Sequence, residues 1–134
     1  MTGTRGTRPV RSRAHNATTP EAAQVQAYIE GIAAEHRPLF DRLQRLVLQV
    51  RPDAALDMSY GMLAYRVGAR RRLYIGAWKH GLSLYGWPQG CEAAIIARHP
   101  ELKTSKGTLR LSPATAAQLT DAELRGLVQA VRDD

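Results

Sequence analysis

The chain has 134 residues, of which 44% are hydrophobic and 23% are charged, and its formal net charge at pH 7 is +7. This length suits one domain with a single core, and no apolar run is long enough for a transmembrane helix. The single cysteine, Cys91, excludes an internal disulfide framework and is typical of a reducing compartment. We therefore expect a cytoplasmic protein that does not bind membranes.

The basic residues are concentrated in two segments. Residues 1–19 contain four arginines and no acidic residue, and residues 60–110 contain nine basic residues and two acidic ones. A positive field of this kind favours anionic partners. The first segment lacks the apolar stretch of a secretory signal and has little to bury. We therefore expect a disordered basic tail over residues 1–18 and one domain over residues 19–134.

Two helices are predicted at the start of this domain. The capping-box spacing of Thr18 and Glu21 starts the first, and helical spacing of apolar residues continues to Ile32. The second helix has Pro38 in its first turn and is stopped by Pro52. Its apolar stripe consists of Leu39, Phe40, Leu43, Leu46, Val47 and Val50.

Short strands follow the two helices. Alternating apolar residues predict strands over residues 62–67, 72–78 and 82–85, joined by turns at residues 68–69 and 79–81. Three consecutive strands on short turns form an antiparallel meander.

The remainder of the chain adds a short helix over residues 90–98 and a fourth strand over residues 108–111. A last amphipathic helix begins with the capping-box pair Thr120 and Glu123. The predicted order is ααβββαβα. We therefore predict an α+β fold in which one small antiparallel sheet of about four strands has its helices packed on one face.

The familiar motifs of nucleotide-binding and metal enzymes are absent from the sequence. Gly107 follows Lys106 instead of preceding it, so there is no P-loop, and no G-x-G-x-x-G occurs. The four histidines lack the spacing of a zinc motif, and nothing nominates a nucleophile with its base. We therefore expect a binding protein and not an enzyme.

Three segments resemble the YdhG-like family, a domain of unknown function whose members are often described as intracellular iron chaperones. They are DMSYGM (residues 57–62), YIGAWKHGLSLY (residues 74–85) and KTSKGTLR (residues 103–110). The likeness runs from about Val25 to Val131. The resemblance implies a frataxin-like α+β fold, a cytoplasmic location, and a binding or chaperone role with iron as a possible ligand.

Two of these segments supply most of the candidate ligand-binding residues. Asp57 and Tyr60 are predicted at a bend before the first strand. The third segment is a hydroxyl-rich loop around Gly107, whose missing side chain lets a ligand approach the backbone. Its basic candidates are Lys103, Lys106 and Arg110. We expect an anion site between the bend and this loop.

The predicted hairpin adds His80 in its turn and Tyr85 on its second strand. Tyr74 and Trp78 share one face of their strand, so they either form an aromatic platform for a ligand or pack in the core beneath a helix. Cys91 is expected to be a small buried residue.

Several partner classes fit these residues. A small anionic ligand or a protein partner fits the candidate loop, and a second copy of the chain fits an aromatic interface. The alternative is an anion-binding or nucleic-acid-binding module that uses residues 60–110, with salt-dependent binding and bases stacked on the hairpin aromatics. Iron is implied by the family resemblance alone.

Overall fold

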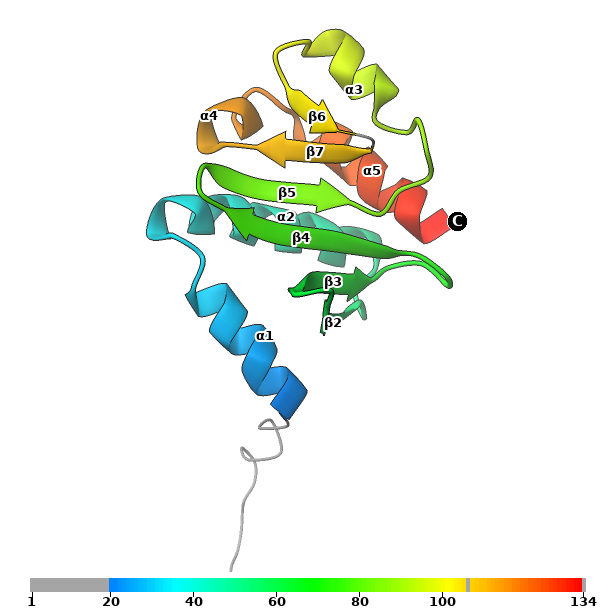
Figure 1. Cartoon of the computed structure of the whole chain (residues 1–134). Helices are drawn as coiled ribbons and strands as arrows, with labels where there is room; N and C mark the ends of the chain where they lie inside the picture. The colour runs from blue at the N-terminus through cyan, green and yellow to red at the C-terminus, as the bar shows by residue number, and fades with distance from the viewer. Residues whose placement is uncertain (1–19, 106, 134) are drawn as a thin grey trace, which may run out of the picture.

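The computed structural model describes residues 20–105 and 107–133, in which six strands form one antiparallel sheet in the order β2-β3-β4-β5-β7-β6 (Figure 1). The strands are β2 (Ala55–Ser59), β3 (Met62–Arg66), β4 (Arg72–Trp78), β5 (Gly81–Tyr85), β6 (Lys103–Ser105) and β7 (Thr108–Leu111). The helices are α1 (Pro20–Glu30), the 3-10 turn η3 (Ala34–His36), α2 (Arg37–Val50), α3 (Ala93–Arg98), α4 (Pro113–Ala116) and α5 (Asp121–Asp133). The predicted α+β fold with one antiparallel sheet is confirmed, while the predicted tail and the Thr18 cap lie outside the described residues.

The sheet is larger than the four strands predicted from the sequence. Both additional strands, β2 and β6, are edge strands of the sheet. Neither contains a run of β-branched or aromatic residues, so each is formed by pairing with its neighbour and not by a strong propensity of its own. Asp57 therefore lies within a strand and not at a bend before the first one.

The helices α2 and α5 lie on the same side of the sheet (Figure 1). The apolar stripe expected on the second helix is buried there except for Val50, which is partly buried, and Leu46 and Val47 are both inaccessible to solvent. The buried residues of α5 follow the same helical spacing. None of the described helices is long and apolar enough to cross a lipid bilayer.

The pairing register decides which side chains face these helices. Leu63 lies opposite Ile75, Ile75 opposite Leu84, and Leu84 opposite Leu109. All four are almost completely buried. Because successive side chains of a strand point to opposite faces, the residues between them lie on the other face of the sheet. In Figure 1 no helix of the described chain lies in front of that face, which we call the open face.

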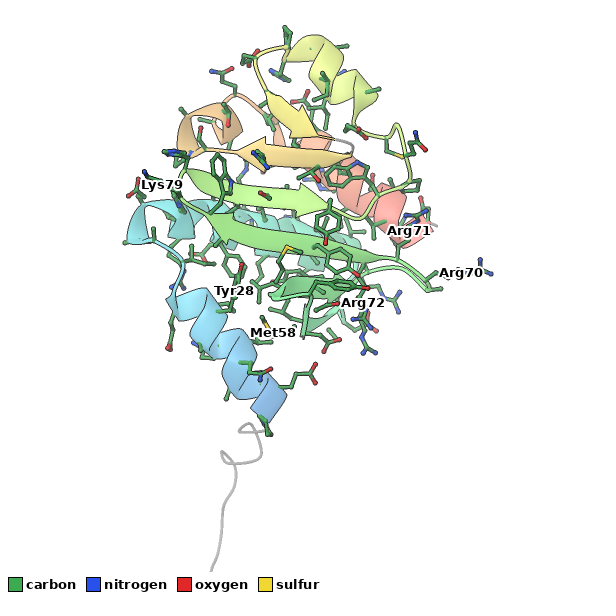
Figure 2. The ribbon with its side chains drawn as sticks, in the orientation of Figure 1. Tyr28, Met58, Arg70, Arg71, Arg72 and Lys79 are labelled. Atoms are coloured by element: carbon green, nitrogen blue, oxygen red, sulfur yellow. The ribbon has the colours of Figure 1, made fainter. Side chains whose placement is uncertain are left out.

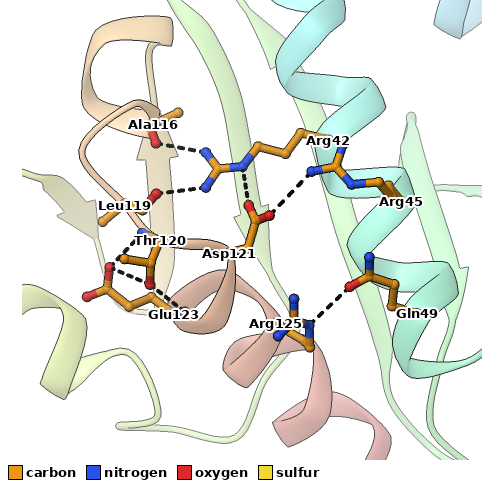
Figure 3. Close-up of polar contacts among 9 residues, drawn as sticks. All are labelled: Arg42, Arg45, Gln49, Ala116, Leu119, Thr120, Asp121, Glu123 and Arg125. Carbon is orange, nitrogen blue, oxygen red and sulfur yellow. Dashed lines mark hydrogen bonds and ion pairs between the residues drawn. The ribbon is translucent and has the colours of Figure 1, made fainter.

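A guanidinium group connects α2 to the segment that precedes α5 (Figure 3). Arg42 donates from Nε to Asp121 Oδ1 at 2.7 Å, and from its two other nitrogens to the carbonyl oxygens of Ala116 and Leu119 at 2.8 and 2.7 Å. Charge-assisted hydrogen bonds of this kind are stronger than neutral ones. Arg42 therefore satisfies one carbonyl at the end of α4 and one in the loop before α5, and it fixes the start of α5.

The capping box predicted for the last helix is present and also holds α3. Thr120 N–H donates to Glu123 Oε1 at 2.8 Å, and Glu123 N–H donates to Thr120 Oγ1 at 3.1 Å. The second carboxylate oxygen of Glu123 accepts from Arg98 at 2.8 Å and lies 3.2 Å from His99 Nε2. The hydrogen bond from Thr120, with those from Arg98 and His99, lowers the pKa of Glu123 to about 2.

A glycine at the start of β5 gives the first test of this packing. A side chain on Gly81 would overlap the backbone carbonyl of Leu111 on β7. We therefore expect Gly81→Ala to lower the free energy of unfolding by about 1–3 kcal/mol, the usual range for overpacking, in urea denaturation. Gly126→Ala on α5 is the control, because nothing lies within 4 Å of its added Cβ. It should stabilise the protein by about 0.5–1 kcal/mol, and equal effects of the two changes would contradict the packing.

The Glu123 cap gives a pH-dependent test. A carboxyl whose pKa falls on folding stabilises the protein above its unfolded pKa, and this stability is lost as the pH falls through the folded value. Glu123→Gln should therefore be less stable than the original chain at pH 7, by about 1 kcal/mol for a weakened cap. The difference should shrink between about pH 4.5 and pH 2. Denaturation curves at a series of pH values measure it, and a difference that is constant down to pH 2 would exclude the capping role.

Candidate functional site

Two tyrosines lie face to face on the open face, near the end of β5. Tyr74 on β4 pairs with Tyr85 on β5, and their ring centroids are 4.6 Å apart with an interplanar angle of 12°. Both side chains are half-buried. The expectation that Tyr74 packs in the core beneath a helix is therefore wrong, and the alternative of an aromatic platform describes its position.

A third tyrosine extends this row from the turn between β2 and β3. Tyr60 has a ring centroid 6.1 Å from that of Tyr74, and its side chain is 84% exposed. Among the non-glycine residues in the described part of the chain, Tyr60 alone has a positive φ, of 54°. Gly61 follows it with a φ of 75°. Such two-residue turns favour Asn or Gly, and another side chain there costs about 1–2 kcal/mol. An exposed aromatic ring is thus held at a strained position.

An open pocket of about 910 Å³ lies at the end of the tyrosine pair. Its walls come from the turn between β3 and β4, the end of β5, the segment before α3, and Gly107 in the turn between β6 and β7. The side chains that matter for its chemistry are Arg70, Arg71, Arg72, Tyr74, Tyr85 and Trp87. Figure 2 shows the three arginines at this end of the sheet.

The arginines of the pocket differ in how they are held. Arg72 lies 4.0 Å from Asp57, whose carboxylate also accepts from Arg66 at 2.6 Å. Arg70 has no hydrogen bond or ion pair with any other described residue and is exposed. The pocket therefore contains one guanidinium close to a carboxylate and one that is exposed to solvent.

The one carboxylate among the described lining residues already accepts a hydrogen bond within the protein. Glu92 accepts a 2.9 Å hydrogen bond from the indole Nε1 of Trp87, which is buried. This bond orders the segment between β5 and α3 and leaves the positive charge of the pocket dominant. Cys91, expected to be buried, is exposed on the same segment.

The Tyr85 hydroxyl at the pocket remains protonated at neutral pH. Partial burial, together with the neighbouring Tyr74 and Tyr60, raises the pKa of Tyr85 above its ordinary value of 10. Tyr85 can therefore donate a hydrogen bond to an anion. Guanidinium groups match the oxygens of phosphates and carboxylates in geometry as well as charge, so the pocket has the chemistry of an anion site.

A second group of side chains lies further along the open face. Trp78 at the end of β4 has Arg110 of β7 5.5 Å above its ring centroid, an arrangement typical of a cation–π contact. The ring of His80 approaches Trp78 edge-on at 5.2 Å. We call Trp78, His80 and Arg110 the tryptophan group.

The structure brings some of the candidates together and separates others. Tyr60 and Tyr85 belong to the tyrosine row, and His80 and Arg110 belong to the tryptophan group. Asp57 lies on edge strand β2 and Lys103 begins β6 at the opposite edge, about 24 Å away across five strand spacings. The side chain of Lys103 and all of Lys106 lie outside the described part.

Sequence reasoning missed the three arginines at residues 70–72. A run of arginines in a turn is usually solvated, so the run alone does not indicate a site. The signal that was available is their position two to four residues before Tyr74, at the start of a strand that carries Tyr74 and Trp78 on one face.

No family model, no curated protein and no solved structure matches this chain.

Proposed function

We propose that this protein is a binding module for a small anionic ligand, held in the pocket between the arginines of residues 70–72 and the stacked pair Tyr74 and Tyr85. The observation that carries this proposal is that these five residues line one open pocket of about 910 Å³. Such clefts with a few convergent polar groups are the usual form of ligand sites.

The charge balance of the pocket supports an anion over a cation or an apolar ligand. Among its described lining residues three arginines stand against Glu92, which is hydrogen-bonded to Trp87. A ligand with phosphate or carboxylate groups would meet guanidinium donors, a tyrosine hydroxyl, and aromatic rings for its less polar part. The glycines of the pocket, Gly86, Gly90 and Gly107, leave backbone accessible beside these groups.

An iron-handling role, which the family resemblance implies, finds no support in the described part of the chain. Residues 20–105 and 107–133 contain no group of three or more His, Cys, Asp or Glu side chains that could hold a metal ion. Iron needs such clusters of oxygen, nitrogen or sulfur ligands. The acidic residues of α1, Glu21 and Glu30, are exposed, while the open face carries arginines that repel a free cation.

Pyrophosphate is a suitable first probe, because it presents two phosphate groups without a base or sugar. In calorimetry with the full chain, we expect binding that weakens as the salt concentration rises. Arg70→Gln should weaken it about tenfold or more, since a charge-assisted hydrogen bond contributes about 1.5–3 kcal/mol and 1.4 kcal/mol is a factor of ten. Because Arg70 is exposed and unpaired in the described part, this change should leave the fold intact.

Arg125→Gln is the matched control. Arg125 lies on α5, on the helical side of the sheet, where its Nε donates to Gln49 (Figure 3). The substitution Arg125→Gln changes the net charge by the same amount as Arg70→Gln but at a position away from the pocket. The affinity for pyrophosphate should therefore be nearly unchanged. The proposal is wrong if the original chain shows no binding at millimolar pyrophosphate, or if Arg70→Gln and Arg125→Gln weaken binding equally.

A further inference from the structure

The open face carries two aromatic groups, and the strand positions between them have small side chains or none. Tyr74 and Trp78 lie four residues apart on β4, about 13 Å along the strand. Between them stands Gly76, which has no side chain and lies opposite Ser83 on β5. A Cβ on Gly76 would come within 2.9 Å of the Met62 sulfur, so the thioether of Met62 covers this glycine from the β3 side. The stretch between the two groups is therefore lined by Gly76, Ser83 and the thioether of Met62.

The aromatic rings of this surface form two separate groups on the open face. The tyrosine row runs from Tyr60 across Tyr74 to Tyr85, and Tyr60 is the most exposed ring. At the other end the Trp78 ring has Arg110 over it. A ligand confined to the arginine pocket would use the Tyr74–Tyr85 end but would leave both Tyr60 and Trp78 without a role.

Positive charge accompanies the rings at both ends. Arg70, Arg71 and Arg72 lie at one end of β4, and the exposed Lys79 lies at the opposite end (Figure 2). Arg110 on β7, next to Trp78, adds a further positive charge to this face. Asp57 is the acidic residue among the described strand positions of this face, and it is paired with Arg66 and Arg72.

We propose that the open face binds single-stranded nucleic acid, with a base stacked on the exposed Tyr60 ring and phosphates in contact with the arginines at residues 70–72 and with Arg110 beside Trp78. Single strands offer accessible base rings together with a regular series of phosphates, which is the combination that aromatic side chains interspersed with basic ones recognise. A duplex presents its phosphates but keeps the faces of its bases stacked inside. An acidic peptide presents negative charge without nucleobase rings. This inference rests on the proposed anion pocket, which would hold one phosphate of the strand.

The strained turn at Tyr60 allows a variant that isolates the ring. Asn is favoured where φ is positive, so Tyr60→Asn removes the aromatic ring while it relieves the backbone. Stacking of one base on an aromatic side chain is lost in this variant. With a labelled oligothymidylate of about ten nucleotides, a length within the usual range of such sites, fluorescence anisotropy should show binding about five- to 150-fold weaker.

A second variant tests the other end of the face. Arg110→Gln removes the guanidinium above Trp78. It should weaken oligothymidylate binding and lower the slope of log affinity against log salt by about 0.7–1, the contribution of one phosphate contact. All measurements use the full chain, so the four arginines of residues 1–19 are the same in every variant.

Two substitutions serve as controls on the helical side. Leu48→Ala on α2 removes an exposed large side chain, 38% accessible, as Tyr60→Asn does on the open face. Arg125→Gln repeats the charge change of Arg110→Gln. Both should bind the oligothymidylate within about twofold of the original chain.

The possible outcomes separate this inference from the anion pocket. If pyrophosphate binds in an Arg70-dependent way but the oligothymidylate does not bind, the single-strand inference is overturned and the anion pocket stands. If neither binds, both are overturned. If the oligothymidylate binds but Tyr60→Asn and Arg110→Gln behave like their controls, or if a duplex of the same length binds equally well, the open face is not a single-strand site. Loss with both variants, together with weak duplex binding, supports the inference.

Discussion

The register of the sheet is the constraint on which the rest of this structure depends. One set of alternating residues, which includes Leu63, Ile75, Leu84 and Leu109, is buried against α2 and α5. Because a strand has a period of two, the same pairing sends every intervening side chain to the other face. A shift by one residue would bury Tyr74 and expose Ile75. The cost of exposing the core therefore fixes the aromatic row, although the row itself contributes little to the core.

The open face combines features that stability alone does not require. Tyr60 is an exposed ring at a position where Asn or Gly would relieve strain, and the arginines of residues 70–72 are gathered around one pocket. Backbone strain concentrates at functional sites in proteins. The fold is secured elsewhere, by the core and by the bonds of Arg42 and Glu123 on the helical side. This division leaves the open face available for a ligand.

Much of this arrangement could be predicted from the sequence, but its assembly could not. Proline and capping positions predicted α2 and α5, and alternation predicted that Tyr74 and Trp78 share a face. The edge strands β2 and β6 were missed because they form through pairing and not through propensity. The pocket was missed because Arg70 and Gly107 become neighbours only through the sheet order, in which β7 pairs with β5. Local patterns do not specify that order.

The measurement that tests the anion site most directly is the map of backbone amide chemical shifts, by nuclear magnetic resonance, as pyrophosphate is added to the full chain. We predict that the shift changes concentrate at residues 70–74, at residues 85–92 and near Gly107, which surround the pocket. The amides of α2 and of the middle of α5 should change little, because both helices lie on the far side of the sheet. Shifts concentrated on those helices, or spread evenly over the chain, would contradict an anion site on the open face.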